Sequence, residues 1–194
     1  EQYSYLKTMK YKIILSSNSP RRKELLAGLD LDYEVRVVDG IDESYPHDLP
    51  ASKIPVYISK KKAAAYTIGE GELVLTADTV VVLGDEVLGK PKDETDAKRM
   101  LRELSGKTHR VITGVCLTTT SKQQAFAVTT DVTFKTLTDE EIDYYVTQYK
   151  PLDKAGAYGI QEWIGYIGVT SLNGSYFNVM GLPVQRIYEA LNNF

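Results

Sequence analysis

The segment Ser17-Asn18-Ser19-Pro20-Arg21-Arg22-Lys23 combines the start of a helix with three consecutive cations. Ser19 is a suitable N-cap, and Pro20 suits the first helical position. Three cations are unfavourable in a first turn, where unpaired N–H groups and the helix dipole are already positive. This conflict favours an anion site, in which amides and guanidinium groups converge on a phosphate. The alternative is a solvated basic turn, since exposed charge costs little.

Asp78 interrupts an apolar run from Leu73 to Leu83 that otherwise has the composition of a buried strand. Aspartate is disfavoured in strands, and a buried unpaired carboxylate is costly. The side chain therefore needs a cation, a metal ion or an outlet to a cleft, and the hard divalent cations that accompany phosphates favour carboxylates. A bulge or a strand end that turns Asp78 outward explains the sequence equally well at this point.

The segment from Gly84 to Pro91 superficially matches the phosphate-binding loop GxxxxGK[ST]. It fails at the last position, where Pro91 replaces the hydroxyl that would hold magnesium, and residues 86–88 have the composition of a strand. We therefore reject a loop of that class. Lys90 remains available as a point charge for a phosphate, with an ordinary surface lysine as the alternative.

Small residues lie between charged and aromatic ones in the segment from Asp153 to Gln161. Gly156 and Gly159 would allow a ligand to approach the backbone closely, and Gln161 offers both a donor and an acceptor. A tight structural turn explains the same pattern, so this motif is weak by itself. Together, the four segments supply cations for phosphates, a carboxylate for a metal ion or water, and a recognition loop.

Strand and helix patterns alternate irregularly along the chain, which predicts an α/β protein with a mixed twisted sheet flanked by helices. The expected strands are 12–15, 33–38, 73–83, 86–88, 111–118 and 125–135. Helices are expected from Pro20, over 56–66, from Asp93 to a stop at Gly106, from Thr138 (which forms a capping box with Glu141), and from Pro183. Residues 39–50 are expected to form a loop. Asn173-Gly174 predicts a type I′ hairpin between strands at 166–172 and 175–180.

Composition limits the class of protein. A chain of 194 residues with 43% hydrophobic and 25% charged residues fits one folded domain, here 11–194 after an N-terminal extension at 1–10. A net charge of −3 disfavours a nucleic-acid partner. The single cysteine, Cys116, is expected to be a small buried hydrophobe, and the distant His47 and His109 cannot form a zinc cluster. No apolar stretch is long enough to span a membrane and the first nine residues lack a signal-like apolar core, so we expect a cytoplasmic protein.

The four segments, in this order, resemble the Maf family of septum formation inhibitor-like nucleoside triphosphate pyrophosphatases. The resemblance rests on residues 15–26, 77–79, 89–91, 104–109, 151–161, 173–176 and 181–183, and it extends from about Lys12 to the C-terminus. One departure is visible: Ser16-Ser17-Asn18 replaces the commoner Ala-Ser-x. The resemblance implies an elongated, two-lobed single domain with a central cleft, of the Maf and inosine triphosphate pyrophosphatase type, and usually a homodimer.

The resemblance also implies hydrolysis of a nucleoside triphosphate to the monophosphate and pyrophosphate, dependent on Mg²⁺ or Mn²⁺. Asp78 would be the proton acceptor, with Glu43 beside it at the metal, and the phosphates would be held by Arg21, Arg22, Lys62 and Lys90. In the subgroup that acts on dTTP and UTP, specificity follows an arginine, a threonine and a glutamine, which match Arg21, Thr79 and Gln161; Ser19 belongs to the same substrate site. Standard and modified pyrimidine nucleotides both remain open as substrates. The alternative hypothesis is a nucleotide-binding regulator of cell division without significant catalysis.

Overall fold

The computed structural model describes residues 10–194, so nine of the ten residues assigned to the N-terminal extension lie outside it. A seven-stranded sheet runs through the molecule in the order β2-β1-β3-β5-β6-β7, with β4 paired to β3. Its strands are β1 (Lys12–Leu15), β2 (Tyr33–Val35), β3 (Glu72–Leu83), β4 (Glu86–Leu88), β5 (Thr108–Thr118), β6 (Gln123–Phe134) and β7 (Val169–Asn173). β1 runs parallel to β2 and β3, and the other pairs are antiparallel. The predicted mixed sheet is confirmed.

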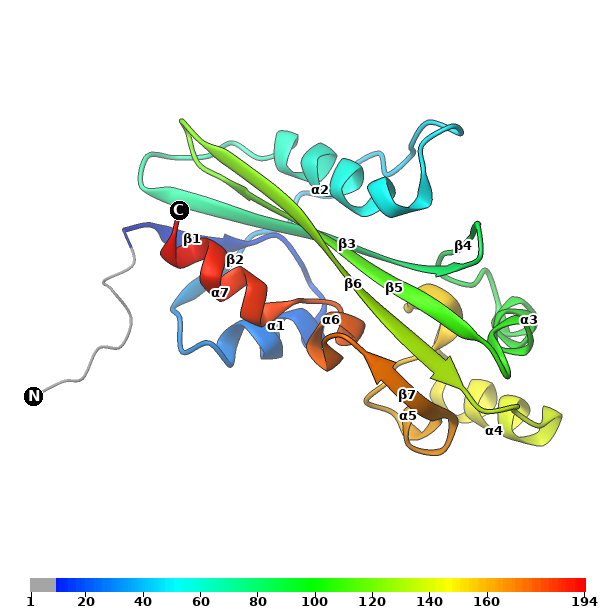
Figure 1. The fold of residues 1–194 in the computed structure, drawn as a ribbon. Helices are drawn as coiled ribbons and strands as arrows, with labels where there is room; N and C mark the ends of the chain where they lie inside the picture. Colours follow the sequence, from blue (N-terminus) through cyan, green and yellow to red (C-terminus); the bar gives the residue numbers. More distant parts are fainter. Residues whose placement is uncertain (1–9) are drawn as a thin grey trace, which may run out of the picture.

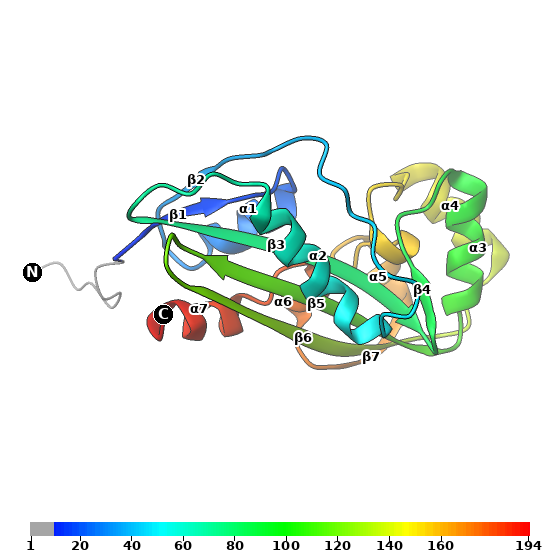
Figure 2. The ribbon, with the colours of Figure 1, turned by 90° about the horizontal axis from the view of Figure 1, so that it is seen from above.

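Helices cover both faces of this elongated sheet. They are α1 (Pro20–Ala27), α2 (Ile54–Ala64), α3 (Glu94–Leu104), α4 (Asp139–Tyr149), α5 (Trp163–Gly168), α6 (Tyr176–Met180) and α7 (Val184–Asn192), with short 3-10 turns at Ala51–Lys53 and Ala155–Ala157. Helix α2 lies on one face, and α1 and α7 lie on the other (Figure 1). The view from above shows α3 and α4 together at the end of the molecule opposite the C-terminus (Figure 2).

The two largest apolar clusters lie toward opposite ends of the sheet. One large cluster joins α3 and α4 to the far end of the strands, with Leu101, Val132 and Tyr145 fully buried. The other joins β1 and α1 to the C-terminal helix α7 through residues such as Leu15 and Ile187. These two cores are the lobes that the resemblance implies.

Helix α2 approaches β5 closely at Gly114, where any larger residue would meet the helix backbone. A Cβ atom at Gly114 would lie only 2.3 Å from the carbonyl carbon of Pro55. Ser59 on the same helix donates its hydroxyl to the carbonyl oxygen of Gly114 at 2.9 Å. The glycine therefore fixes the height of α2 above the strands.

The sequence signals for helix starts are confirmed. Ser19 accepts a hydrogen bond from the Arg22 N–H at 3.3 Å, with Pro20 at the first helical position. Thr138 and Glu141 form the reciprocal capping box at the start of α4. These side chains satisfy N–H groups that the helix itself leaves unpaired.

The hairpin expected at Asn173-Gly174 is wrong. Residues 163–168 form α5, and only 169–173 form a strand; Ser175 then caps the short helix α6 by accepting the Asn178 N–H. A type I′ turn needs positive φ at both central residues, but only Gly174 has it. The strand expected over 33–38 is also shorter, since β2 ends at Val35.

Candidate active site

The cleft lies where one edge of β3 has no hydrogen-bonded neighbouring strand, between Leu75 and Val81. β1 pairs with β3 only as far as Leu15 opposite Leu75, and β4 pairs with it from Val81 onward. The stretch of β3 between these pairings borders a cavity of about 860 Å³. The exposed edge is satisfied by side chains, because the Ala77 carbonyl accepts from Lys62 at 3.0 Å and from Arg22 at 3.4 Å. The change from parallel to antiparallel pairing thus opens the sheet at this point.

The site residues predicted from the sequence all border this one cavity, although they come from six separate segments. They are Ser19, Arg21, Arg22, Glu43, Lys62, Asp78, Thr79, Lys90 and Gln161. This places them together, while the chemical role of each stays a prediction.

Asp78 lies in the middle of β3, not at a bulge. It pairs opposite Gly114 in a register that runs without interruption from Val74 to Val82, so the alternative of an outward-turned strand end is wrong. Its Oδ2 atom is buried without a hydrogen-bond partner among the described residues. Burial raises the pKa of Asp78 to about 6, although the charges of Lys62 and Arg22 act in the opposite direction. A carboxyl with such a pKa is a suitable general base near neutral pH.

Lys62 links two carboxylates across the cleft. Its ammonium lies 3.4 Å from Oε1 of Glu43 and 3.8 Å from Oδ1 of Asp78. Burial lowers the pKa of Lys62, and the charge of Asp78 opposes this shift. Glu43, which comes from the irregular 39–50 segment, is thereby brought next to Asp78.

The segment Ser19-Pro20-Arg21-Arg22, called the SPRR turn below, contains two arginines that make different contacts. Arg22 donates Nε to the Gly181 carbonyl at 2.9 Å and Nη2 to the Thr79 hydroxyl at 3.1 Å, in addition to its bond to Ala77. Arg21 has no such backbone partners among the described residues and makes only a longer ion pair with Asp153, at 3.5 Å. Arg22 is therefore anchored to the protein, and Arg21 is the arginine free to turn toward a ligand.

Thr79 is positioned by a series of hydrogen bonds that continues from its hydroxyl to Thr113 and then to Asn178. Its Oγ1 lies 2.9 Å from Oγ1 of Thr113, its neighbour across the sheet. Thr113 in turn contacts the backbone carbonyl of Asn178, a fully buried residue that bonds β5 and β6 through its amide. The sequence did not single out Thr113 or Asn178, because each serves the site through a partner distant in the chain.

The loop at 153–162 closes the cavity from the side of α4. Gly156, at φ +69°, packs so closely on Val81 that a Cβ atom would lie 2.8 Å from its Cγ2 atom. Its N–H donates to the Gly89 carbonyl at 3.1 Å, which places the segment of Lys90 beside the loop. Gln161 carries a buried Oε1 atom without a hydrogen-bond partner among the described residues.

Asp153 and Lys154, two charged residues of this loop, also line the cavity, and they were not selected as site residues from the sequence. Lys154 is only 11% exposed and lies 3.0 Å from Asp153 and 3.4 Å from Glu162. The signal was present in the sequence, since Asp153-Lys154 directly precedes the glycine-containing stretch, but adjacent opposite charges resemble an ordinary solvated pair.

Other expectations concern features outside the cavity. Cys116 is a free, fully buried thiol, as expected. Within residues 10–194 no cluster of three or more His, Cys, Asp or Glu side chains is arranged to hold a metal ion. None of the helices in that range has the length and apolar character needed to cross a membrane.

Comparison with known proteins places the chain in a family. The model of the Maf-like proteins matches residues 12–194. A dTTP/UTP pyrophosphatase of Phocaeicola vulgatus is 64% identical over 184 residues, covering 94% of this chain and 95% of that protein. One from Bacteroides thetaiotaomicron is 59% identical with the same coverage. A solved HAM1 protein from Coxiella burnetii has a TM-score of 0.46 at 12% identity, covering 95% of this chain and all of that one. With a family model that spans nearly its whole length, the chain belongs to the Maf family.

Proposed function

We propose that this chain hydrolyses dTTP and UTP to the nucleoside monophosphate and pyrophosphate. The observation that carries the proposal is Asp78, a largely buried carboxylate at the open edge of β3, 15% exposed and facing a cavity that cations line. The activity named for the closely similar relatives supports the same reaction. A site built only to bind an anion has no use for an additional negative charge at its centre.

In the proposed mechanism Asp78 accepts a proton from the attacking water. The Asp78 side chain is 15% exposed and borders the cavity, with its Oδ1 atom 3.8 Å from the Lys62 ammonium, so the carboxylate can meet a water that enters the cleft. Attack at the α-phosphorus releases pyrophosphate, whose charge Arg21, Lys62 and Lys90 stabilise. Arg22 contributes a fixed positive charge and holds Thr79 and the Gly181 backbone in place.

Asp78 and Glu43 are suited to hold Mg²⁺ or Mn²⁺ with the help of the substrate. Both offer hard carboxylate oxygens, and both lie within 4 Å of the same Lys62 ammonium. Two carboxylates are enough, because Mg²⁺ usually takes its remaining ligands from phosphates and water. Such an ion neutralises charge on the phosphates when it is bound.

Base recognition is proposed for Thr79 and Gln161, with Arg21 as the third specificity residue. Thymine and uracil present both N–H and carbonyl groups, which match a hydroxyl and an amide. The unpartnered Oε1 atom of Gln161 supports this role, because a buried acceptor without a partner is costly until a ligand satisfies it.

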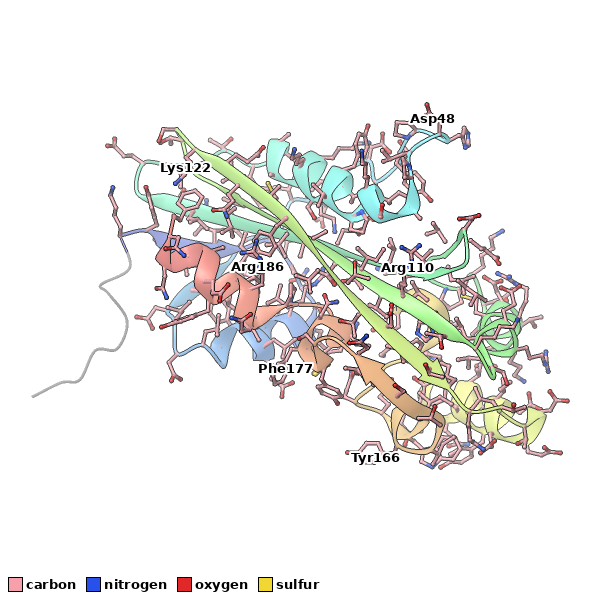
Figure 3. The ribbon with its side chains drawn as sticks, in the orientation of Figure 1. Asp48, Arg110, Lys122, Tyr166, Phe177 and Arg186 are labelled. Atoms are coloured by element: carbon pink, nitrogen blue, oxygen red, sulfur yellow. The ribbon has the colours of Figure 1, made fainter. Side chains whose placement is uncertain are left out.

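We also propose that the protein is a cytoplasmic homodimer. Exposed aromatic residues on either side of the edge strand β7 support a second copy as partner: Tyr166, on α5, is 82% exposed, and Tyr176 and Phe177, on α6, are 42% and 48% exposed. Figure 3 shows Tyr166 and Phe177 at the outer surface of α5 and α6. The single reduced cysteine is consistent with a cytoplasmic location. Sedimentation velocity tests the dimer directly.

The reaction is tested by incubating the protein with each nucleoside triphosphate and Mg²⁺ or Mn²⁺ and resolving the products by chromatography. We expect monophosphate and pyrophosphate in equal amounts, with dTTP and UTP preferred over purine nucleotides. Orthophosphate and a nucleoside diphosphate would mean that the γ bond is cut, contrary to the proposal. A panel that includes modified pyrimidine nucleotides extends the same assay to the question of the preferred substrate.

A further inference from the structure

Gln161 lies in a tight turn that spans Gly159 to Glu162. The Glu162 N–H donates to the Gly159 carbonyl at 3.0 Å, which closes a four-residue turn with Gln161 at its third position. The direction of the Gln161 side chain therefore depends on how the two ends of the turn are held.

Both ends of this turn are held by one hydroxyl group from a different element. Tyr145, on α4, accepts the Gly159 N–H at 3.0 Å and donates its proton to Oε1 of Glu162 at 2.8 Å. The tyrosine ring is fully buried in the core of that lobe, so the hydroxyl has little freedom to move. Glu162 is in turn 3.4 Å from Lys154 in the cavity wall.

The hydroxyl also remains able to donate under working conditions. Burial raises the pKa of Tyr145 above its ordinary value, so the group stays protonated near neutral pH. The Tyr145 hydroxyl therefore acts both as an acceptor, toward Gly159, and as a donor, toward Glu162.

We propose that Tyr145 is a positioning residue for substrate recognition: its hydroxyl clamps the Gly159–Glu162 turn and so directs Gln161 at the pyrimidine base. The inference rests on the proposed function of Gln161. Tyr145 itself does not line the cavity, so it acts through the turn.

The chain provides a matched control for this role. Tyr149 lies one helical turn farther along α4 and stacks on Tyr145, with ring centroids 5.1 Å apart. Its ring is 37% exposed, and no hydrogen bond of its hydroxyl is found among the described residues. Tyr145→Phe and Tyr149→Phe therefore remove the same atom from neighbouring rings, and only the first removes the clamp.

The test compares two probes that share only part of the site. Isothermal titration gives the dissociation constant of dTMP, which carries the base. The dissociation constant of inorganic tripolyphosphate, which carries no base, is obtained from titrations in which it competes with dTMP. For Tyr145→Phe we expect dTMP to bind about tenfold more weakly while tripolyphosphate is unaffected. In turnover assays KM for dTTP should rise with kcat within about twofold of the wild type. Tyr149→Phe should match the wild type with both probes.

Unchanged dTMP binding in Tyr145→Phe would overturn the proposal, as would equal weakening of both probes, which indicates a general structural defect. Should Tyr145→Phe fail to fold, Glu162→Leu removes the other half of the clamp and must weaken dTMP selectively. Binding of dTMP does not require turnover. A wild type that binds dTMP without cleaving dTTP would therefore refute the proposed function and leave this inference tested on its own.

Discussion

Asp78 has one carboxylate oxygen near an ammonium and one without a partner among the described residues, in a strand where charge is normally excluded. For Asp78→Asn we expect kcat to fall by at least about 100-fold, since the amide cannot accept a proton from water. Nucleotide binding in the absence of metal should be retained, because the change removes no cation. Pyrophosphate release and calorimetric titration of dTTP measure the two quantities. Near-normal turnover in this variant would remove Asp78 from the mechanism, and no turnover in the wild type would favour a binding protein.

Arg22 and Arg21 should respond differently to the same substitution. Arg22→Lys keeps the charge but cannot reach Gly181, Thr79 and Ala77 together, so we expect a loss of about 2 kcal/mol in the free energy of unfolding. Arg21→Lys should leave stability unchanged and weaken tripolyphosphate binding. Urea denaturation and competition binding of both variants check this; equal stability of the two would show that the Arg22 contacts contribute little.

The site was predictable where a residue conflicts with its local surroundings. Cations in the first turn of α1 and an aspartate inside an apolar strand each violate a local rule, and such violations are expected at functional sites. The sequence could not reveal that Arg22 is anchored by backbone carbonyls from β3 and from the end of α6, or that Tyr145 holds the loop of Gln161. These contacts join residues from about 14 to 159 positions apart, and no local pattern encodes them.

At the scale of elements, α2 and β5 together determine where Lys62 lies. Gly114 faces Pro55 and is also the partner of Asp78 across the sheet. Gly114→Ala would push α2 outward, and we expect a loss of about 3 kcal/mol in stability together with weaker turnover, because Lys62 moves with its helix. Thermal unfolding and steady-state kinetics measure both effects.

Gly89→Ala is the stability control for this prediction, since a Cβ atom there would meet nothing within 4 Å. If Gly114→Ala melted at the same temperature as Gly89→Ala, the close approach of α2 to the sheet would not be a constraint.

The start of α4, which has a capping signal, and the bounds of the long strands β3, β5 and β6 were predicted to within a few residues. The region from 163 to 180 was not. Its Asn-Gly pair favours a hairpin locally, but the buried amide of Asn178 bonds the carbonyls of Val111 and Val128, which requires a helical turn beside the sheet. Tertiary contacts overrode the turn preference there.

At the scale of the whole molecule, stability should depend on the ionisation of His109. His109, near the start of β5, is 1% exposed, and its Nε2 atom contacts the Tyr158 hydroxyl in the 153–162 loop. Burial lowers the pKa of His109 to about 4 from 6.5. The unfolded chain therefore binds a proton at a higher pH than the native protein does. The free energy of unfolding should fall by roughly 3 kcal/mol as the pH decreases from about 6.5 to 4.

The measurement uses the Asp78→Asn background, because the raised pKa of Asp78 would act with the opposite sign in the same range. Urea denaturation at several pH values compares this variant with one that also carries His109→Gln, which cannot titrate. If the free energy of unfolding changed with pH in the same way in both proteins, His109 would not make this contribution.

The lobe that carries the SPRR turn is built from both ends of the described chain. Leu15 and Leu26 share one apolar cluster with Val184, Ile187 and Leu191. Contacts between such distant segments form late, since the loop between them must first be closed. During synthesis on the ribosome, the strands and helices in the middle of the chain can assemble as they emerge. The lobe that carries Arg21 and Arg22 also needs α7, which is made later. The phosphate-binding side of the cleft is therefore completed only after α7 has left the ribosome.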